Sequence, residues 1–170
     1  MGSNIETLLE SDPYTLTKNE KSVIFLNSMK EDVSFHYEKS KEFRKLCDNR
    51  GFTQTKNFSV EEIPFLPVSL FKKFKLKSVP DSEIFKTVYS SATTSDLPSI
   101  IFLDRITSER QTRVLISIMK NFLTEKKDFL IIDQDSSMNT LPDIKSRSSA
   151  IRGFFPFMKS VKFGLDDNLK

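Results

Sequence analysis

The sequence contains no tryptophan, and cysteine and histidine occur once each, as Cys47 and His36. A single cysteine cannot form an intramolecular disulfide, so we expect a reducing compartment, the cytoplasm. A zinc site of the usual kind needs several cysteine or histidine ligands, and the composition argues against one. His36 could act as a base and Cys47 as a nucleophile, but unpaired residues of these types more often have a purely structural place.

Long apolar runs are also missing. No stretch of about 18 apolar residues is available to span a membrane, and the polar start of the chain lacks the apolar part of a secretory signal. With 38% hydrophobic and 29% charged residues, the composition is that of an ordinary folded domain. The 26 Lys and Arg nearly balance the 23 Asp and Glu, so the net charge of +3 does not indicate nucleic acid as a partner.

The 170 residues suffice for one domain with its own hydrophobic core. Residues 1–16 are expected to form a loosely held leader, with a helical turn at residues 5–10 that ends before the Asp12-Pro13 pair. Residues 17–170 are then expected to form a single α/β domain.

Helices are predicted for the first part of that domain. Thr17 and Glu20 have the spacing of a capping box, which starts a helix. The apolar positions of this helix recur every three or four residues at Leu26, Met29, Val33 and Tyr37, and after a step of six they continue at Phe43 and Leu46. Gly51 is a natural C-terminal stop. The pattern leaves open whether this region is one helix or two helices joined near residues 31–32.

A lysine-rich region follows. Ser59 and Glu62 predict a capped turn, and residues 68–74 predict a short helix. Four lysines are then interleaved with apolar residues: Lys72, Lys73, Lys75 and Lys77. Such a cluster could be a nucleic-acid surface, or an exposed strand edge on which lysine discourages pairing with another chain. The even overall charge favours the strand edge.

The second half of the chain predicts the order strand, loop, strand, helix, strand. The strands are expected at residues 83–89, 99–103 and 129–132, and the third is apolar enough to be buried on both faces. Thr107 is expected to cap the helix. The apolar face of that helix is predicted to consist of Val114, Leu115, Ile118, Met119 and Phe122. This order predicts an α/β fold with a mixed sheet that is parallel in part.

Beyond the third strand, Asp133 lies where open α/β sheets place ligand-binding groups. Residues 134–149 are polar and predict a long surface loop, and residues 161–165 predict a last strand. An aromatic stretch precedes that strand, and its normal covering is expected to be missing or supplied by another chain.

The candidate functional site is the hydroxyl-rich segment, residues 89–99, between the first two strands. Backbone N–H groups of such a loop can form a concave nest for an anion, and hydroxyl groups add further donors. The residues expected to bind a phosphate are Ser90, Ser91, Thr93, Thr94 and Ser95. The alternative is a polar hairpin loop, because these residue types also form turns for local reasons. Arg105 and Arg110 could pair with the phosphate or with Asp104.

Within this segment, Ser90-Ser91-Ala92-Thr93-Thr94-Ser95 resembles the Ser-Ser-Gly-Thr-Thr-Gly phosphate loop of adenylate-forming enzymes. Four further stretches are similar to segments of the acyl-protein synthetase family, the LuxE-type long-chain fatty acid–protein ligases. These stretches lie at residues 35–47, 63–72, 103–111 and 129–133. Their order over residues 20–165 is much more specific than any one of them.

The resemblance implies the N-terminal portion of a ligase that activates a carboxylic (fatty) acid with ATP and Mg²⁺ as acyl-AMP and transfers the acyl group to an acceptor protein. The hydroxyl groups of the loop would bind the β- and γ-phosphates. The implied fold resembles part of the N-terminal domain of adenylate-forming enzymes, with N-terminal helices followed by a mixed sheet. Because such enzymes are considerably longer than this chain, we expect little ligase activity from the chain alone.

Two positions depart from the family pattern: Ala92 and Ser95 stand where the family has glycine. Glycine tolerates positive φ and lets a phosphate approach the backbone closely, whereas alanine and serine do so at a steric cost. The departures predict weakened nucleotide binding. They also support an alternative function, a non-catalytic module of the same fold that binds a partner chain, such as one supplying the C-terminal part of a synthetase.

Overall fold

The computed structural model describes residues 3–54, 57–90, 97–138 and 143–165. It contains two compact units, Met1–Glu83 and Ile84–Lys170, which are described here one at a time. The expected division into a leader at residues 1–16 and one domain at residues 17–170 stays a prediction.

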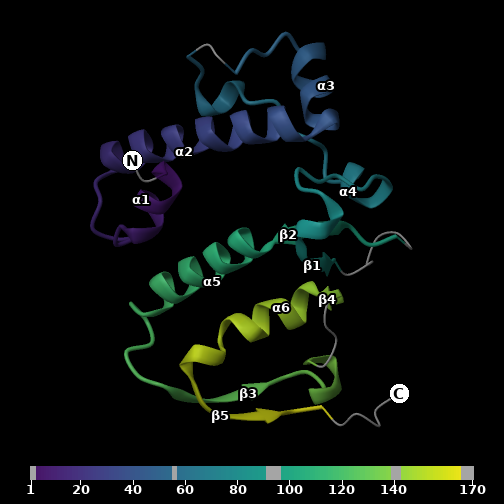
Figure 1. Ribbon diagram of the computed structural model, residues 1–170. Coiled ribbons are helices and arrows are strands. Elements are labelled where there is room, and N and C mark those ends of the chain that lie inside the picture. Colours follow the sequence, from purple (N-terminus) through teal and green to yellow (C-terminus); the bar gives the residue numbers. More distant parts are fainter. Residues whose placement is uncertain (1–2, 55–56, 91–96, 139–142, 166–170) are drawn as a thin grey trace. The chain divides into compact units, whose positions relative to one another are not determined.

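The first unit opens with α1 (Asn4–Glu10), which lies along α2 (Lys18–Lys39) (Figure 1). The carboxylate of Glu31, in the middle of α2, accepts a hydrogen bond from Ser3 Oγ at 2.6 Å. It also accepts from the backbone nitrogen and Nδ2 of Asn4, at 3.1 and 2.6 Å. One acidic side chain therefore joins the start of α1 to α2.

The helical region between residues 17 and 50 is two helices, α2 and α3 (Lys41–Asn49). The capping box predicted for α2 is confirmed, with the N–H of Thr17 donating to the Glu20 carboxylate at 2.8 Å. The predicted junction near residues 31–32 is wrong, because the break falls at Ser40. Ser40 has extended backbone angles, and its hydroxyl caps the first turn of α3.

The C-terminal end of α3 is fixed by Gly51, as predicted, with a φ of 63°. The N–H of Phe52 donates to the carbonyl of Cys47 at 2.9 Å, which closes a Schellman turn. Cys47 is fully buried, and burial raises the pKa of its thiol. Its place is therefore structural, in the core of this unit with Val33 and Phe58.

Three short helical elements complete the first unit: η1 (Val60–Glu62), α4 (Leu70–Lys73) and η2 (Asp81–Glu83). The capped turn predicted at η1 is confirmed, since the N–H of Ser59 donates to the Glu62 carboxylate at 2.7 Å.

The lysine cluster is not a strand edge, so that prediction is wrong. Residues 74–80, which the structure describes throughout, contain no strand. They connect α4 to η2, and Lys77 forms an ion pair with Asp81. Alternation of charged and apolar residues predicts a strand only where a neighbouring strand is available to pair with it.

The second unit contains a sheet with the strand order β2–β1–β4. Its strands are β1 (Ile84–Tyr89), β2 (Ile100–Asp104) and β4 (Asp143–Lys145). β1 pairs antiparallel with β2 and parallel with β4. The sheet is mixed, as predicted, and the strands on either side of the hydroxyl-rich segment are antiparallel neighbours. The predicted third strand, at residues 129–132, is not part of this sheet, and the parallel neighbour of β1 is β4 instead.

Helix α5 (Arg105–Met119) follows β2 directly. Its N-cap is Asp104, and the prediction that Thr107 caps the helix is wrong. The Asp104 carboxylate satisfies a first-turn amide, so the helix begins three residues earlier than the predicted start at Ser108. The helix also ends before Phe122, which is 66% exposed.

A second sheet pairs β3 (Lys127–Ile131) in parallel with β5 (Met158–Phe163). The prediction that the β3 region is buried on both faces is wrong, because Leu130 and Ile132 are 69% and 78% exposed while Ile131 is buried. Among the described residues, only one face of this two-stranded sheet is covered by other elements.

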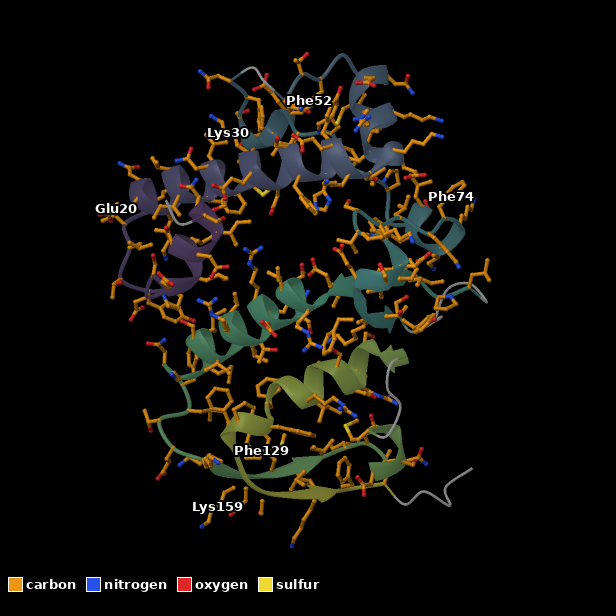
Figure 2. All side chains as sticks on the ribbon, in the orientation of Figure 1. Glu20, Lys30, Phe52, Phe74, Phe129 and Lys159 are labelled. Carbon is orange, nitrogen blue, oxygen red and sulfur yellow. The ribbon has the colours of Figure 1, made fainter. Side chains whose placement is uncertain are left out.

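The covered face carries Phe129, whose ring lies 6.4 Å from that of Phe154. Figure 2 shows Phe129 on the α6 side of β3, whereas Lys159 of β5 points to the opposite side. Ile131 and Phe157 are buried as core residues of this unit.

The long loop predicted at residues 134–149 is also wrong. This region forms η3 (Asp135–Met138), β4 and the start of α6 (Ser146–Gly153). Serine has a modest helix propensity, so α6 depends on packing: Ser148 is fully buried, and the helix contacts β1 and α5. A 3-10 turn, η4 (Phe155–Phe157), then leads into β5, which begins earlier than the predicted last strand.

The fold class is mixed α/β, with N-terminal helices followed by strands, as predicted. Within the described ranges, no helix combines the length and the apolar character that crossing a bilayer requires.

Candidate functional site

Ser90 and Ser99 hold together the two ends of the hydroxyl-rich segment. The N–H of Ser90 donates to the carbonyl of Ser99 at 3.0 Å, and the N–H of Ser99 donates to Ser90 Oγ at 2.8 Å. Ser99 is buried. A serine hydroxyl that accepts one hydrogen bond still has its own proton to donate, so Ser90 can contact an anion while holding Ser99.

Four of the five predicted phosphate-binding residues lie outside the described residues: Ser91, Thr93, Thr94 and Ser95. Their role stays a prediction. Ser90 directly follows Tyr89, the last residue of β1 and the first of the segment. The structure therefore describes the two ends of the segment, which the hydrogen bonds between Ser90 and Ser99 hold next to each other.

A hollow of about 390 Å³ lies on one face of the β1–β2 pair, and we call it the strand–helix hollow. Its strand wall consists of Lys86 and Val88 from β1 and Ile101 and Leu103 from β2. These residues alternate along each strand, and Lys86 is opposite Leu103 while Val88 is opposite Ile101. The wall thus ends two residues before Ser90, at the base of the hydroxyl-rich segment.

Two helices form the remaining walls. α5 contributes Ser108, Gln111, Thr112 and Leu115, and α6 contributes Ser146, Ser149, Ala150 and Gly153. Both sets have the spacing i, i+3, i+4, i+7, which is one stripe of a helix. Figure 1 shows α5 and α6 side by side, each beginning near the β2–β1–β4 sheet. Hydroxyl groups line the hollow at the first turns, and Leu115 and Gly153 line it further along.

Gly153 permits the close approach of the two helices at the apolar end. A side chain at this position would collide with Cδ2 of Leu115. The absence of a Cβ therefore lets Leu115 pack against α6 within the wall of the hollow.

The hollow contains two cationic side chains, Lys86 and Arg152, and no Asp or Glu is among its described lining residues. Lys86 Nζ donates to Ser149 Oγ at 3.0 Å, and an Arg152 Nη2 proton is donated to the carbonyl of Met138. Arg152 Nε is buried and lacks a hydrogen-bond partner among the described atoms. Burial, together with the charge of Arg152, lowers the pKa of Lys86.

Asp133, the predicted ligand-binding carboxylate, is buried and already neutralised. Its Oδ2 is 2.6 Å from Nε of Arg147, and its Oδ1 accepts from the N–H of Gln134 at 2.8 Å. It does not line the strand–helix hollow. Its described contacts are those of a structural ion pair.

The other sequence candidates have structural contacts as well. The guanidinium of Arg105 stacks over the ring of Phe85 at 4.3 Å. In the first unit, His36 Nδ1 is 2.7 Å from Ser78 Oγ, and the pKa of His36 is lowered by desolvation, which Asp32 opposes. No group of three or more His, Cys, Asp or Glu gathers as a metal site in the described part of the chain.

Sequence reasoning found the hydroxyl-rich segment but missed the hollow. Its polar stripe on α5 was visible as Ser108, Gln111 and Thr112, in a helix that was predicted. The α6 wall could not be predicted, because α6 begins within a predicted loop. The pairing of Lys86 with Arg152 could not be predicted either, since the two residues are far apart in the sequence.

Comparison with known proteins finds the same family that the ordered motifs resemble. The family model for LuxE acyl-protein synthetases matches residues 1–169. Two relatives share the name long-chain-fatty-acid–luciferin-component ligase. The one from Aliivibrio fischeri is 31% identical over 109 residues, which are 64% of this chain and 28% of the relative. The one from Vibrio harveyi is 26% identical over 98 residues, which are 58% of this chain and 25% of the relative.

The matched stretches thus span only about a quarter of the length of these relatives. The family match, by contrast, extends over nearly the whole of this chain. The chain belongs to the LuxE acyl-protein synthetase family.

Proposed function

We propose that this chain supplies the phosphate-binding part of an ATP-dependent acyl-protein synthetase, an acid–protein ligase. The observation that carries the proposal is the pair of hydrogen bonds between Ser90 and Ser99, which closes the base of the hydroxyl-rich segment next to the sheet. Family membership over residues 1–169 supports it. In this proposal the second unit corresponds to part of the N-terminal domain of an adenylate-forming enzyme.

In the proposed reaction, a carboxylate oxygen of a fatty acid attacks the α-phosphorus of ATP. The bond from that phosphorus to the β-phosphate oxygen breaks, which yields acyl-AMP and pyrophosphate. A nucleophile of the acceptor protein then attacks the acyl carbonyl carbon, and AMP leaves. Charge on the phosphates is the main obstacle to the first step, so donors fixed around them are the contribution we assign to this chain.

The groups assigned to the β- and γ-phosphates are the hydroxyls and amides of Ser90, Ser91, Thr93, Thr94 and Ser95. Mg²⁺ would neutralise part of the phosphate charge. In nucleotide sites Mg²⁺ is usually held by one or two carboxylates together with the phosphates, so the nucleotide would supply much of its coordination. The adenine site, the acceptor site and the remaining catalytic groups would lie in polypeptide beyond the portion of the relatives that this chain matches.

A second candidate function is a non-catalytic module that associates with a partner chain. Ala92 and Ser95 favour it, because both stand at glycine positions of the family's phosphate loop. In that case the loop no longer binds phosphate, and the partner would be the remainder of a split synthetase.

Calorimetric titration with ATP and Mg²⁺ separates the two functions. Restoring both glycines, in the variant Ala92→Gly with Ser95→Gly, should raise the affinity for ATP about tenfold by removing steric cost at two backbone positions. Ser160→Gly, at an exposed position of β5, is the matched control and should change nothing. Equal affinities of all three proteins would remove the support for phosphate binding and leave the partner module.

A second measurement concerns activity. We expect the chain alone to form no acyl-AMP when fatty acid, ATP and Mg²⁺ are trapped with hydroxylamine. Steady formation of the hydroxamate by the purified chain would show that a complete catalytic site is present in it.

A further inference from the structure

Lys86 and Ser149 form a close pair of polar side chains within the strand–helix hollow. Nζ of Lys86 donates to Oγ of Ser149 at 3.0 Å, and both residues are half-buried and line the hollow. Burial, and then the charge of Arg152, lower the pKa of Lys86, which favours the neutral amine. A desolvated lysine beside another cation is a nucleophile that can form a Schiff base with a carbonyl compound.

Arg152 adds an anion-binding group to this pair. Its Nη2 donates to the carbonyl of Met138, but its Nε is buried and has no hydrogen-bond partner among the described atoms. Within the described lining of the hollow there is no Asp or Glu to offset the charge. A buried cationic N–H without a partner is unfavourable, and the carboxylate of a bound molecule would satisfy it.

The remaining lining indicates a small guest with an aliphatic part. Val88, Ile101, Leu103 and Leu115 give the hollow an apolar wall. At about 30 Å³ for each non-hydrogen atom, the liquid volume of a water, 390 Å³ holds roughly a dozen such atoms. A molecule that uses the amine, the guanidinium and the apolar wall together has a carbonyl next to a carboxylate and a short hydrocarbon side chain. Such a molecule is a 2-oxo acid.

We propose that the strand–helix hollow is a binding site for a small aliphatic 2-oxo acid, which forms a Schiff base with Lys86 while its carboxylate is bound by Arg152. Nζ attacks the carbonyl carbon, and a proton passes from the nitrogen through the Ser149 hydroxyl to the former carbonyl oxygen. The resulting carbinolamine loses water, which leaves the C=N bond. This site goes beyond the phosphate-binding role proposed above and does not depend on it.

The test traps the Schiff base on the purified full chain, without nucleotide. The probe is 4-methyl-2-oxopentanoate, and sodium cyanoborohydride reduces the C=N bond to a stable secondary amine that mass spectrometry of a digest locates. The reference is Lys162, an exposed lysine of β5 that does not line the hollow. We expect at least about ten times as much adduct at Lys86, the factor of one charge-assisted hydrogen bond to the carboxylate.

A second probe measures the contribution of the carboxylate. 4-Methylpentan-2-one has the same carbonyl and side chain but no carboxylate. It should give at least about tenfold less adduct at Lys86 than the 2-oxo acid does, because the contact with Arg152 is missing.

Variants then assign the two roles. Lys86→Arg keeps the cation and the hydrogen-bond donor but cannot form a Schiff base, so the adduct at this position should disappear while urea unfolding stays close to that of the native chain. In Arg152→Gln the ratio of 2-oxo acid adduct to ketone adduct at Lys86 should fall at least about tenfold. The ratio is used because it cancels any change in the reactivity of the amine itself. Arg152→Lys should retain more of the ratio, and Lys162→Arg should react at Lys86 as the native chain does.

Equal adduct at Lys86 and Lys162 would overturn the site. Equal adduct from the ketone and the 2-oxo acid in the native chain, or an unchanged ratio in Arg152→Gln, would overturn the carboxylate contact. The comparison of the two probes needs only the native chain, so it holds even where a variant does not fold. Failure of ATP to bind would leave all of these results untouched.

Discussion

Oδ1 of Asp104 lies 2.6 Å from the backbone nitrogen of Thr107, and this contact joins the last residue of β2 to the first turn of α5. Two walls of the strand–helix hollow therefore meet at a single N-cap. A cap at this position fixes where Ser108 and the rest of the α5 stripe lie relative to the strands.

Removal of this cap should loosen α5. We expect Asp104→Ala to lower the free energy of unfolding by about 1 kcal/mol, the usual cost of losing an N-cap, and Asp104→Asn to retain most of the stability. Urea unfolding gives the free energy, and hydrogen exchange of the first-turn amides of α5 locates the change. Asp135→Ala, at an exposed aspartate, is the control. Equal stability of Asp104→Ala and the native chain would contradict the cap.

Loss of the hydrogen bond between Ser90 and Ser99 should also lower the stability of the protein. Ser90→Ala removes the acceptor of the buried Ser99 amide, so the free energy of unfolding should fall by about 1–3 kcal/mol. Ser90→Thr keeps the hydroxyl and should cost less. Ser82→Ala, at an exposed serine, should change nothing. If the Ser99 amide proton exchanges at the same rate in Ser90→Ala as in the native chain, this hydrogen bond is absent in solution.

Acid should release α1 from α2. The hydrogen bond from Ser3, with smaller contributions from Asn4, lowers the pKa of Glu31 below its ordinary value of 4.5. The folded state therefore favours the carboxylate, so its contribution to stability is present above pH 4.5 and is lost as the pH falls through the lower folded pKa. Amide signals of α1 followed by NMR from pH 6 to pH 3 should move in this range.

The matched variant for this titration is Glu31→Gln, in which the α1 signals should lose their dependence on pH. Glu42→Gln, at an exposed position of α3, should titrate as the native chain does. Identical curves for the native chain and Glu31→Gln would assign the transition to another group.

Sequence-based prediction succeeded where a few neighbouring residues decide the structure. The capping box of Thr17 and Glu20, the stop at Gly51 and the strands around the hydroxyl-rich segment all depend on local chemistry. It failed where competing local signals exist: Ser40 caps α3 away from the predicted junction near residues 31–32, and Asp104 caps α5 in place of Thr107. Each is a good N-cap residue, so the sequence carries a capping signal at both positions.

Packing explains the other failures. The serines of α6 carry no apolar pattern, so the helix could not be predicted without the elements that it packs against. Residues 129–132 are all apolar, yet an apolar sequence does not show whether a second layer covers the strand. For the candidate site, the hydroxyl-rich segment was predictable as a motif, whereas the hollow depends on four elements meeting in space.

Two adjacent isoleucines test the one-sided burial of β3. Ile131 is buried and Ile132 is 78% exposed. We expect Ile131→Ala to lower the free energy of unfolding by about 2–4 kcal/mol, and Ile132→Ala to change it by no more than about 0.5 kcal/mol. Urea unfolding measures the free energy of unfolding of both variants, and the comparison is direct because each removes the same atoms from an isoleucine. A large effect at Ile132 would mean that its face is covered in solution.

The close approach at Gly153 predicts a coupling between two helices. Gly153→Ala should lower the free energy of unfolding by about 0.5–1.5 kcal/mol, because the new methyl group displaces Cδ2 of Leu115 from its rotamer. In a Leu115→Ala background the same change should cost nothing, or even stabilise α6 through the better helix propensity of alanine. A double-mutant cycle measures the difference, and additive effects would contradict the contact.

The parallel pairing of β1 with β4 has a consequence for synthesis. β2 follows β1 closely, but β4 is more than fifty residues further along the chain, where Thr87 is opposite Asp143. At a ribosomal rate of about 5–20 residues per second, the second edge of β1 stays unpaired for roughly 3 to 11 seconds while those residues emerge. During that interval its backbone amides can pair with another nascent chain, so this edge is where we expect chaperones to protect the emerging protein.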